Sequence, residues 1–123
     1  MGKHESGRER GFMIFSQGDI IKFDFDPTLG HEQAGYRPAV VISRKIFNQK
    51  TGLVTVCPIT GTSRQYPTWV ALDGKTTTHG FVLCEHVKTI DVSARNPKYI
   101  EKIDDAVLDK ILAIASAIIQ KDE

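Results

Sequence analysis

Short apolar segments, separated by glycine and proline turns, constrain the fold of this chain more than any other feature. In residues 20–26 apolar and charged side chains alternate, which is the pattern of a half-buried strand. Residues 39–42 are continuously apolar and suit a central strand, with Pro38 tolerated only at its beginning. Further short strands are expected at residues 53–57, 68–72, 80–84, 88–91 and 99–103. Short strands at this spacing predict a closed or partly closed β-barrel.

Only the C-terminal segment has a strong helical period. Asp104 and Asp105 suit the start of the helix, where a side-chain acceptor and a negative charge are both favourable. The apolar side chains span an arc of about 160° at 100° per residue, which is wide for a helix lying on one small barrel. A homodimer is the simplest way to cover the excess surface. The residues on this arc are Val107, Leu108, Ile111, Leu112, Ile114, Ala115, Ile118 and Ile119.

The length and composition indicate one globular domain. A chain of 123 residues with 41% hydrophobic and 25% charged residues suffices for one core and is too short for two. We expect a flexible polar arm at residues 1–16 and a single domain at residues 17–121. The two cysteines, Cys57 and Cys84, fit free buried thiols. Without a secretory or membrane-spanning pattern, a cytoplasmic location is expected.

The net charge of +1 requires any nucleic-acid site to be a local patch of arginine and lysine. The loop at residues 27–38 brings His31, Glu32 and Arg37 within seven residues. Metal-free RNA cleavage needs proton transfer, which suits His or Glu, and charge stabilisation, which suits Arg. The alternative is a solvated loop whose polar residues have no chemical role.

Two further clusters of residues are candidates for a functional site. Thr60 ends a strand near Arg64 and can donate to a phosphate oxygen, or can serve only as a β-former. Cys84, Glu85 and His86 lie together in the sequence, but their spacing fits no standard zinc pattern, so no metal or cofactor is expected. Trp69, within a strand, is expected in the core rather than in a base-stacking platform.

The chain resembles the MazF/PemK/Kid family of toxins over residues 18 to about 119. The most specific match is the block of residues 30–38, with sequence GHEQAGYRP, and it is preceded by Gly18-Asp19-Ile20-Ile21. Weaker matches follow at residues 23–28, 47–48, 51–52, 57–60, 80–82, 87–91 and 94–95.

The resemblance implies a compact SH3-like β-barrel with short helices and a homodimeric toxin of a type II toxin–antitoxin system. Such a toxin is an endoribonuclease that cleaves single-stranded RNA at short sequences, without metal, by 2′-OH attack to leave a 2′,3′-cyclic phosphate. It thereby inhibits translation and growth. A cognate antitoxin is expected to lay an extended acidic tail over the active face.

By matching position, Arg37 resembles the catalytic arginine of the family and Thr60 its active-site threonine. His31 and Glu32 resemble the loop pair that contacts RNA or transfers protons. Kid-like members of the family have a catalytic arginine at the position of Leu83 and a catalytic aspartate at the position of Glu85. Glu85 is therefore a candidate carboxylate, and the assignment of base and acid stays open. The expected RNA-binding residues are Gln33, Arg64, Lys88 and Arg95.

Two other function classes fit the sequence less well. A CcdB-like, non-enzymatic toxin shares the barrel but uses an aromatic C-terminal end, and this chain ends at Glu123 without a nearby tryptophan. A plain SH3-like binding module would not explain why His31, Glu32, Arg37 and Thr60 fall together. The sequence does not reveal the RNA sequence cut, the antitoxin or the role of residues 1–16.

Overall fold

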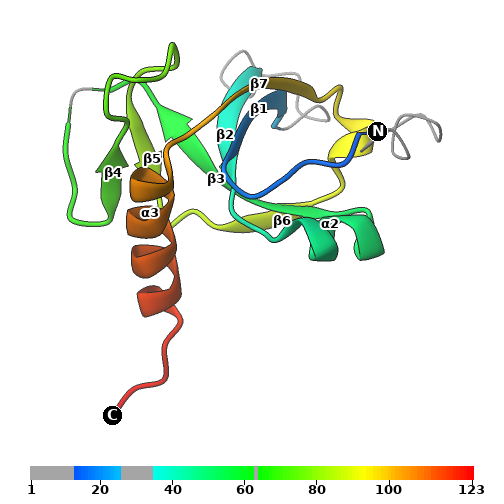
Figure 1. The fold of residues 1–123 in the computed structure, drawn as a ribbon. Coiled ribbons are helices and arrows are strands. Elements are labelled where there is room, and N and C mark those ends of the chain that lie inside the picture. Colours follow the sequence, from blue (N-terminus) through cyan, green and yellow to red (C-terminus); the bar gives the residue numbers. More distant parts are fainter. Residues whose placement is uncertain (1–12, 26–34, 63) are drawn as a thin grey trace.

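The computed structural model describes residues 13–25, 35–62 and 64–123 as a mainly β structure with two α-helices (Figure 1). The helical segments are α2 (Lys45–Thr51), the 3-10 helix η1 (Val92–Ala94) and α3 (Asp105–Ile118). The strands are β1 (Asp19–Asp24), β2 (Tyr36–Val41), β3 (Val54–Thr60), β4 (Trp69–Ala71), β5 (Phe81–Leu83), β6 (Lys88–Ile90) and β7 (Lys98–Lys102).

The strands form one antiparallel sheet in the order β4-β5-β3-β2-β1-β7, and β6 also pairs with β3. Each expected strand is confirmed, with ends that differ by a few residues. The largest differences, three residues each, are at the end of β3 and at the start of β2, which begins at Tyr36 and contains Pro38. Pro38 pairs with β1, whereas the pairing of β2 with β3 begins only at Ala39. The strand therefore needs no N–H from Pro38 on its β3 side.

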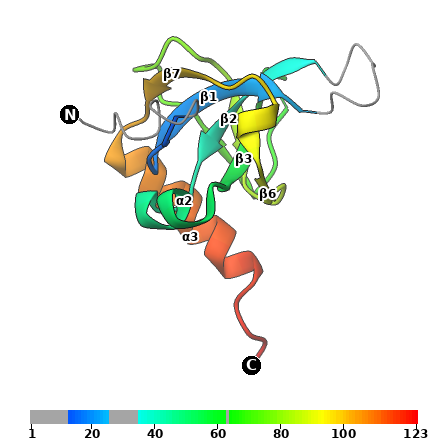
Figure 2. The ribbon, with the colours of Figure 1, turned by 90° about the vertical axis from the view of Figure 1, so that its right-hand side faces the viewer.

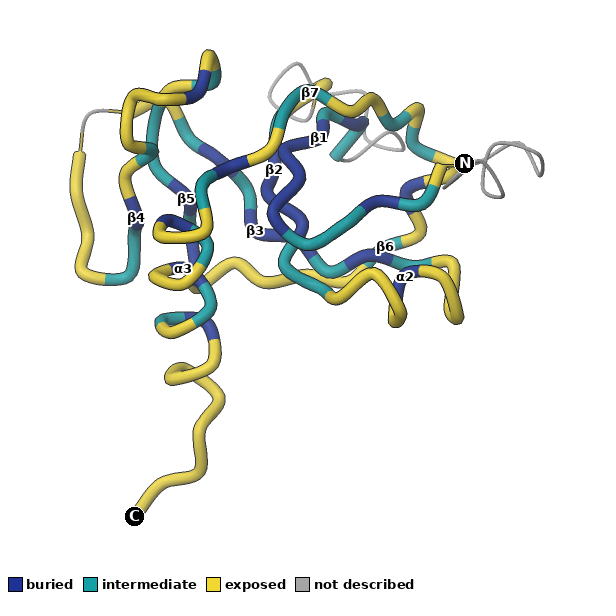
Figure 3. The backbone as a smooth tube through the Cα atoms, in the orientation of Figure 1, coloured by how far each residue is buried: buried dark blue, intermediate teal, exposed yellow. Residues whose placement is uncertain are grey.

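Both faces of the central sheet are buried, because alternate side chains enter two different cores. One core, here called the helix core, joins the sheet to α3 and includes Ile20, Val40 and Ile111. The other, the Phe15 core, includes Phe15 and Ile21. Burial on both faces along β1, β2 and β3 is visible in Figure 3. This alternation fixes which way every other side chain on these strands points.

The expected C-terminal helix is confirmed as α3, and its apolar surface is only partly covered. Val107, Ile111 and Ala115 are buried, whereas Ile118 and Ile119 are 48% and 83% exposed. The lower half of the helix extends away from the sheet in both ribbon views (Figures 1 and 2). At its start, Asp104 makes no side-chain cap. Its carboxylate instead accepts a hydrogen bond from the Lys75 ammonium at 2.8 Å.

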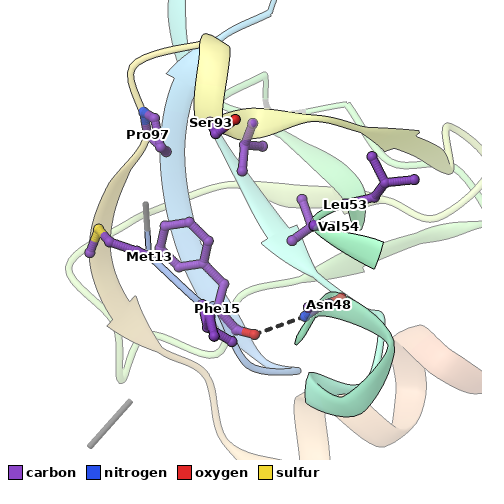
Figure 4. A pocket seen from close by; sticks show the side chains of 10 residues that line it. Met13, Phe15, Asn48, Leu53, Val54, Ser93 and Pro97 are labelled. Atoms are coloured by element: carbon purple, nitrogen blue, oxygen red, sulfur yellow. Dashed lines mark hydrogen bonds between the residues drawn. The ribbon is translucent and has the colours of Figure 1, made fainter. Parts of the chain in front are cut away.

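The segment before β1 is anchored by α2. The Asn48 Nδ2 donates to the Phe15 carbonyl at 2.8 Å (Figure 4). The Asn48 Oδ1 accepts from the Ser43 hydroxyl at 2.6 Å. Phe15 itself is only 2% exposed. Residues 1–12 lie outside the described residues, so the division into an arm at 1–16 and a domain at 17–121 stays a prediction.

In the sheet order, β4 and β7 stand at the two ends, and no ladder joins them within the described ranges. An antiparallel sheet with a C-terminal helix is thus established, whereas closure into a barrel is not observed. None of the helices in the described part of the chain is long and apolar enough to cross a membrane.

Candidate functional site

The strand registers bring Arg37 and Thr60 to one face of the sheet, here called the active face. Arg37 lies two residues before Ala39 on β2, and Thr60 lies four residues after Val56 on β3. Both Ala39 and Val56 belong to the Phe15 core. Side chains an even number of residues apart on a strand point the same way, so Arg37 and Thr60 share that side. Lys88 joins them, because it lies directly opposite Val56 in the pairing of β3 with β6.

Two cationic side chains of this face lie over one aromatic ring. The Phe25 ring stacks on Phe23 with 4.5 Å between centroids and 9° between planes. The Arg37 Cζ is 6.0 Å and the Lys88 Nζ 5.6 Å from the Phe25 centroid. These distances are those of cation–π contacts. Phe25, Arg37 and Lys88 are called the cationic patch below, and this patch supplies local positive charge that the net charge of +1 does not.

Arg95 hydrogen-bonds the backbone that carries Phe25 of the cationic patch. Its Nη1 donates to the Asp24 carbonyl at 3.1 Å and also to the Phe25 carbonyl. The Asp24 N–H donates in return to the Arg95 carbonyl at 2.9 Å. The guanidinium of Arg95, which was expected to bind RNA, therefore hydrogen-bonds the backbone that carries Phe25.

The loop candidates His31, Glu32 and Gln33 lie outside the described residues. The residues that flank this segment are tied together, since the Phe25 N–H donates to the Gly35 carbonyl at 3.3 Å. Phe25 and Gly35 therefore lie side by side, and Arg37 follows Gly35 by two residues.

Thr60 ends β3 where β5 approaches most closely. Thr60 pairs with Phe81, and its hydroxyl accepts from the Thr62 N–H at 3.4 Å. Gly80, just before Phe81, has φ +122°, and an added Cβ would lie 2.0 Å from the Thr60 carbonyl oxygen. Only glycine fits this position without displacement of the backbone. The close approach fixes Thr60 against β5.

A row of aromatic rings lies at the β4–β5 end of the same face. The Tyr66 and Trp69 centroids are 5.1 Å apart, and those of Trp69 and Phe81 are 6.0 Å apart. These three residues are called the aromatic patch. The Arg64 Cζ lies 5.5 Å from the Tyr66 centroid. Arg64 therefore borders the aromatic patch.

The expectation that Trp69 lies in the core is wrong. Trp69 is half-buried, and it belongs to neither core because its pairing with Leu83 places it on the outer side of the sheet. The sequence offered one signal for this orientation. Val70 is the apolar residue that enters the core, so its neighbour Trp69 has to point the other way.

Glu85 is held by the aromatic patch. Its Oε1 accepts from the Thr68 hydroxyl at 2.6 Å and its Oε2 from the Trp69 indole N–H at 2.9 Å. The His86 Nε2 lies 3.6 Å from the same Oε2. Partial desolvation acts to raise the pKa of Glu85, but the hydrogen bonds from Thr68 and Trp69 lower it further, so the net pKa is below the ordinary value.

The cysteines are free and buried as expected. Burial is the main cause that raises the pKa of Cys57 to about 12 and that of Cys84 to about 11. Thiols with such pKa values are protonated at neutral pH and are poor nucleophiles. Among the described residues, no three histidine, cysteine or acidic side chains come together as a metal site.

The fold is shared with solved toxin structures. MazF from Deinococcus radiodurans is similar with a TM-score of 0.77 and 30% identity, over 86% of this chain and 96% of that one. The MazE–MazF complex from the same organism contains a chain similar at a TM-score of 0.76 and 25% identity, over 89% and 98% of the two chains. The described strands and helix α3 thus form a MazF fold, and that neighbour is seen bound to MazE.

Sequence relatives agree with the fold. The endoribonuclease toxin MazF of Escherichia coli strain K12 is 49% identical over 78 residues, which are 63% of this chain and 69% of the relative. The endoribonuclease PemK of Escherichia coli is 36% identical over 132 residues, covering 97% and 99% of the two chains. A family of PemK-like, MazF-like toxins of type II toxin–antitoxin systems matches residues 16–119. The chain belongs to this family.

Proposed function

We propose that this MazF/PemK-family endoribonuclease toxin cuts single-stranded RNA without metal. The observation that carries the proposal is the shared face of Arg37, Lys88 and Thr60, with both cations over the Phe25 ring. A phosphate seated on this face would meet a permanently charged guanidinium, an ammonium and a hydroxyl donor. These groups would stabilise a transition state in which negative charge grows on the oxygens of the phosphate.

In the proposed reaction, the 2′-oxygen attacks the adjacent phosphorus while the bond from phosphorus to the 5′-oxygen breaks. One group removes the 2′-OH proton, another protonates the leaving 5′-oxygen, and the products are a 2′,3′-cyclic phosphate and a 5′-OH. Arg37 and Thr60 stabilise the phosphorane oxygens, and His31 and Glu32 remain candidates for the proton transfers. Glu85 is a weaker candidate, because both of its carboxylate oxygens accept hydrogen bonds.

RNA binding is proposed to use the cationic patch together with Gln33 and Arg64. Arg95 acts from behind by holding the Phe25 backbone. The cognate antitoxin is proposed to cover the active face with an acidic tail and so exclude RNA. The protein is proposed to act in the cytoplasm. The complex of MazF with MazE in a structural neighbour supports such a partner.

A homodimer is proposed through the uncovered end of α3. Ile118 and Ile119 are exposed, and with Ile42, Val87 and Leu112 they line a largely apolar cleft of about 410 Å³. Burying this surface against a second copy would remove it from water.

We also propose that the sheet is the SH3-like barrel of the family, closed by side chains rather than by a ladder. Val70 of β4 and Ile103 after β7 belong to the same helix core with Ile111 of α3. Glu101 of β7 accepts hydrogen bonds from the hydroxyls of Thr77 and Thr78, in the loop between β4 and β5, at 2.9 and 2.7 Å. These contacts bridge the two ends of the strand order.

The test is cleavage of a long, weakly structured RNA by the purified chain in excess EDTA, with end-group analysis of the products. We expect cutting to persist and to leave cyclic phosphates, and a 2′-deoxy nucleotide just before a mapped cut should block that site alone. Activity that EDTA abolishes and Mg²⁺ restores would overturn the metal-free mechanism. A chain that cuts no RNA at all would overturn the proposal as a whole.

A further inference from the structure

The aromatic patch presents ring surface to solvent. Tyr66 is 53% exposed, and Trp69 and Phe81 are half-buried. The three rings come from the loop before β4, from β4 and from β5, and neighbouring centroids are 5.1 and 6.0 Å apart. Every nucleobase has a flat π surface, and stacking on aromatic side chains is a common way for proteins to bind single strands.

Trp69 is fixed in place by more than packing. Its indole N–H donates to Glu85 Oε2 at 2.9 Å, and its backbone N–H donates to the Tyr66 carbonyl at 3.0 Å. Glu85 is fixed in turn by the Thr68 hydroxyl at 2.6 Å. Hydrogen bonds to an ionised carboxylate are among the stronger ones in proteins. The ring is therefore pre-organised, and a ligand that stacks on it loses little affinity to the ordering of the side chain.

The same hydrogen bonds make Glu85 a poor general base. They lower its pKa below the ordinary value for glutamate, whereas a base for chemistry at neutral pH works best with a pKa near 7. Both of its oxygens also already accept a hydrogen from the protein. The arrangement suits a side chain that positions another one.

The aromatic patch is continuous with the reactive end of β3. Phe81 lies opposite both Thr60 and Ala71, and Trp69 lies opposite Leu83, so Thr60, Phe81 and Trp69 point to the same side. Adjacent strands lie about 4.8 Å apart. An RNA strand whose phosphate reaches Thr60 can therefore lay a neighbouring base on the aromatic patch. Arg64, over Tyr66, is placed to meet the next phosphate.

We propose that Tyr66, Trp69 and Phe81 form a subsite that stacks an unpaired nucleobase of the bound RNA, and that Glu85 is the positioning residue for Trp69. The inference rests on the proposed function and extends it to the recognition of a base beside the cut. Glu85 then acts on RNA affinity through Trp69, and not on the proton transfers.

Because Trp69 is the only tryptophan in the chain, its fluorescence reports on the subsite directly. The probe is a short RNA that holds a mapped cut site with one 2′-deoxy nucleotide before the cut, so that it binds without cleavage. RNA should quench Trp69 emission in the parent. Trp69→Ala should weaken binding by about 5- to 100-fold, the range for loss of one stacked base, and Trp69→Phe should weaken it less.

The variants of Glu85 separate positioning from catalysis. Glu85→Ala should shift the Trp69 emission and raise KM, because the indole N–H loses its acceptor. Glu85→Gln keeps an amide oxygen for the indole and should lie between the parent and Glu85→Ala in both measurements. Asp109→Asn, on the exposed side of α3, serves as the control. Thermal unfolding of each variant shows whether it is folded.

Three outcomes would overturn the inference. The first is RNA binding by folded Trp69→Ala with the parental Kd. The second is an emission spectrum of Trp69 that RNA leaves unchanged. The third is a loss of about 100-fold or more in kcat for Glu85→Gln at unchanged Kd, which would make Glu85 a catalytic residue. In each case a parent that still cuts RNA leaves the proposed function standing, whereas a parent that cuts none overturns that function first.

Discussion

The cationic patch and the aromatic patch lie on one face of the sheet, yet they use charge in opposite ways. In the cationic patch, Arg37 and Lys88 lie over the Phe25 ring and bring positive charge to the surface. In the aromatic patch, the carboxylate of Glu85 lies at the edge of Trp69 and fixes the ring. The first arrangement suits a phosphate, and the second suits a neutral flat base.

Removal of the guanidinium from the cationic patch is the most direct test of its part in cleavage. Arg37→Ala should lose at least about 100-fold in cleavage rate, the scale for one pre-organised stabiliser of developing charge. Arg37→Lys should recover only part of the rate, because a point charge does not make a two-pronged contact. The matched control is Arg44→Ala, since Arg44 is exposed beyond the opposite end of β2. A folded Arg37→Ala that cuts RNA within about threefold of the parent would contradict the assignment.

Gly80 lies where the aromatic patch meets Thr60, and an alanine there tests this close approach. The added Cβ would meet the Thr60 carbonyl oxygen at 2.0 Å, at a φ of +122°. We expect Gly80→Ala to lower the free energy of unfolding by about 3 kcal/mol, the upper end of the cost of a strained backbone. Gly74→Ala has a positive φ without a close neighbour and should cost about 1 kcal/mol. Urea unfolding measures both, and equal losses would show that the clash with Thr60 does not matter.

The salt dependence of RNA binding sharpens the difference between the patches. Lys88→Ala should make the slope of log Kd against log salt shallower by about 0.7, the value for one phosphate contact on a single strand. Lys50→Ala, on α2, is the control. Trp69→Ala should weaken binding and leave the slope nearly unchanged. An unchanged slope for Lys88→Ala would remove this lysine from the phosphate path.

A small effect on the pH dependence of stability is expected at Glu101, which accepts hydrogen bonds from the loop between β4 and β5. Desolvation acts to raise its pKa, but the hydrogen bonds from Thr78 and Thr77 lower it more. The stabilisation is therefore complete above the ordinary glutamate pKa of about 4.3 and is lost as the pH falls through the lowered folded pKa. Glu101→Gln should flatten the fall in unfolding free energy below that pH. Parallel pH profiles for the parent and this variant would argue against the role of Glu101.

The strands and α3 were predictable because their signals are local. Alternation along residues 20–26 and the helical period after residue 104 each reflect one element lying against a core. The choice of Arg37 and Thr60 as site residues came from the family resemblance, and the pairing of β2 with β3 places both on one side of the sheet. This shared side depends on pairing between strands, which no local pattern specifies.

The aromatic patch and the role of Arg95 were not predictable in the same way. Tyr66, Trp69 and Phe81 meet only because β4 pairs with β5 in one register. RNA binding by Arg95 stays a prediction, and nothing in the sequence indicates that its guanidinium donates to carbonyls about 70 residues earlier in the chain. Contacts over such separations are set by the completed fold, and a window of neighbouring residues does not contain them.

The hydrogen bonds from Arg95 to the end of β1 join two parts of the chain that are synthesised far apart in time. A nascent chain that has not yet reached residue 95 contains β1 and β2, but it lacks the hydrogen bonds from Arg95 to the Asp24 and Phe25 carbonyls, and β7 is not there to pair with β1. Domains fold as units once their long-range partners have left the ribosome. The cationic patch is therefore assembled only after nearly the whole chain has been made.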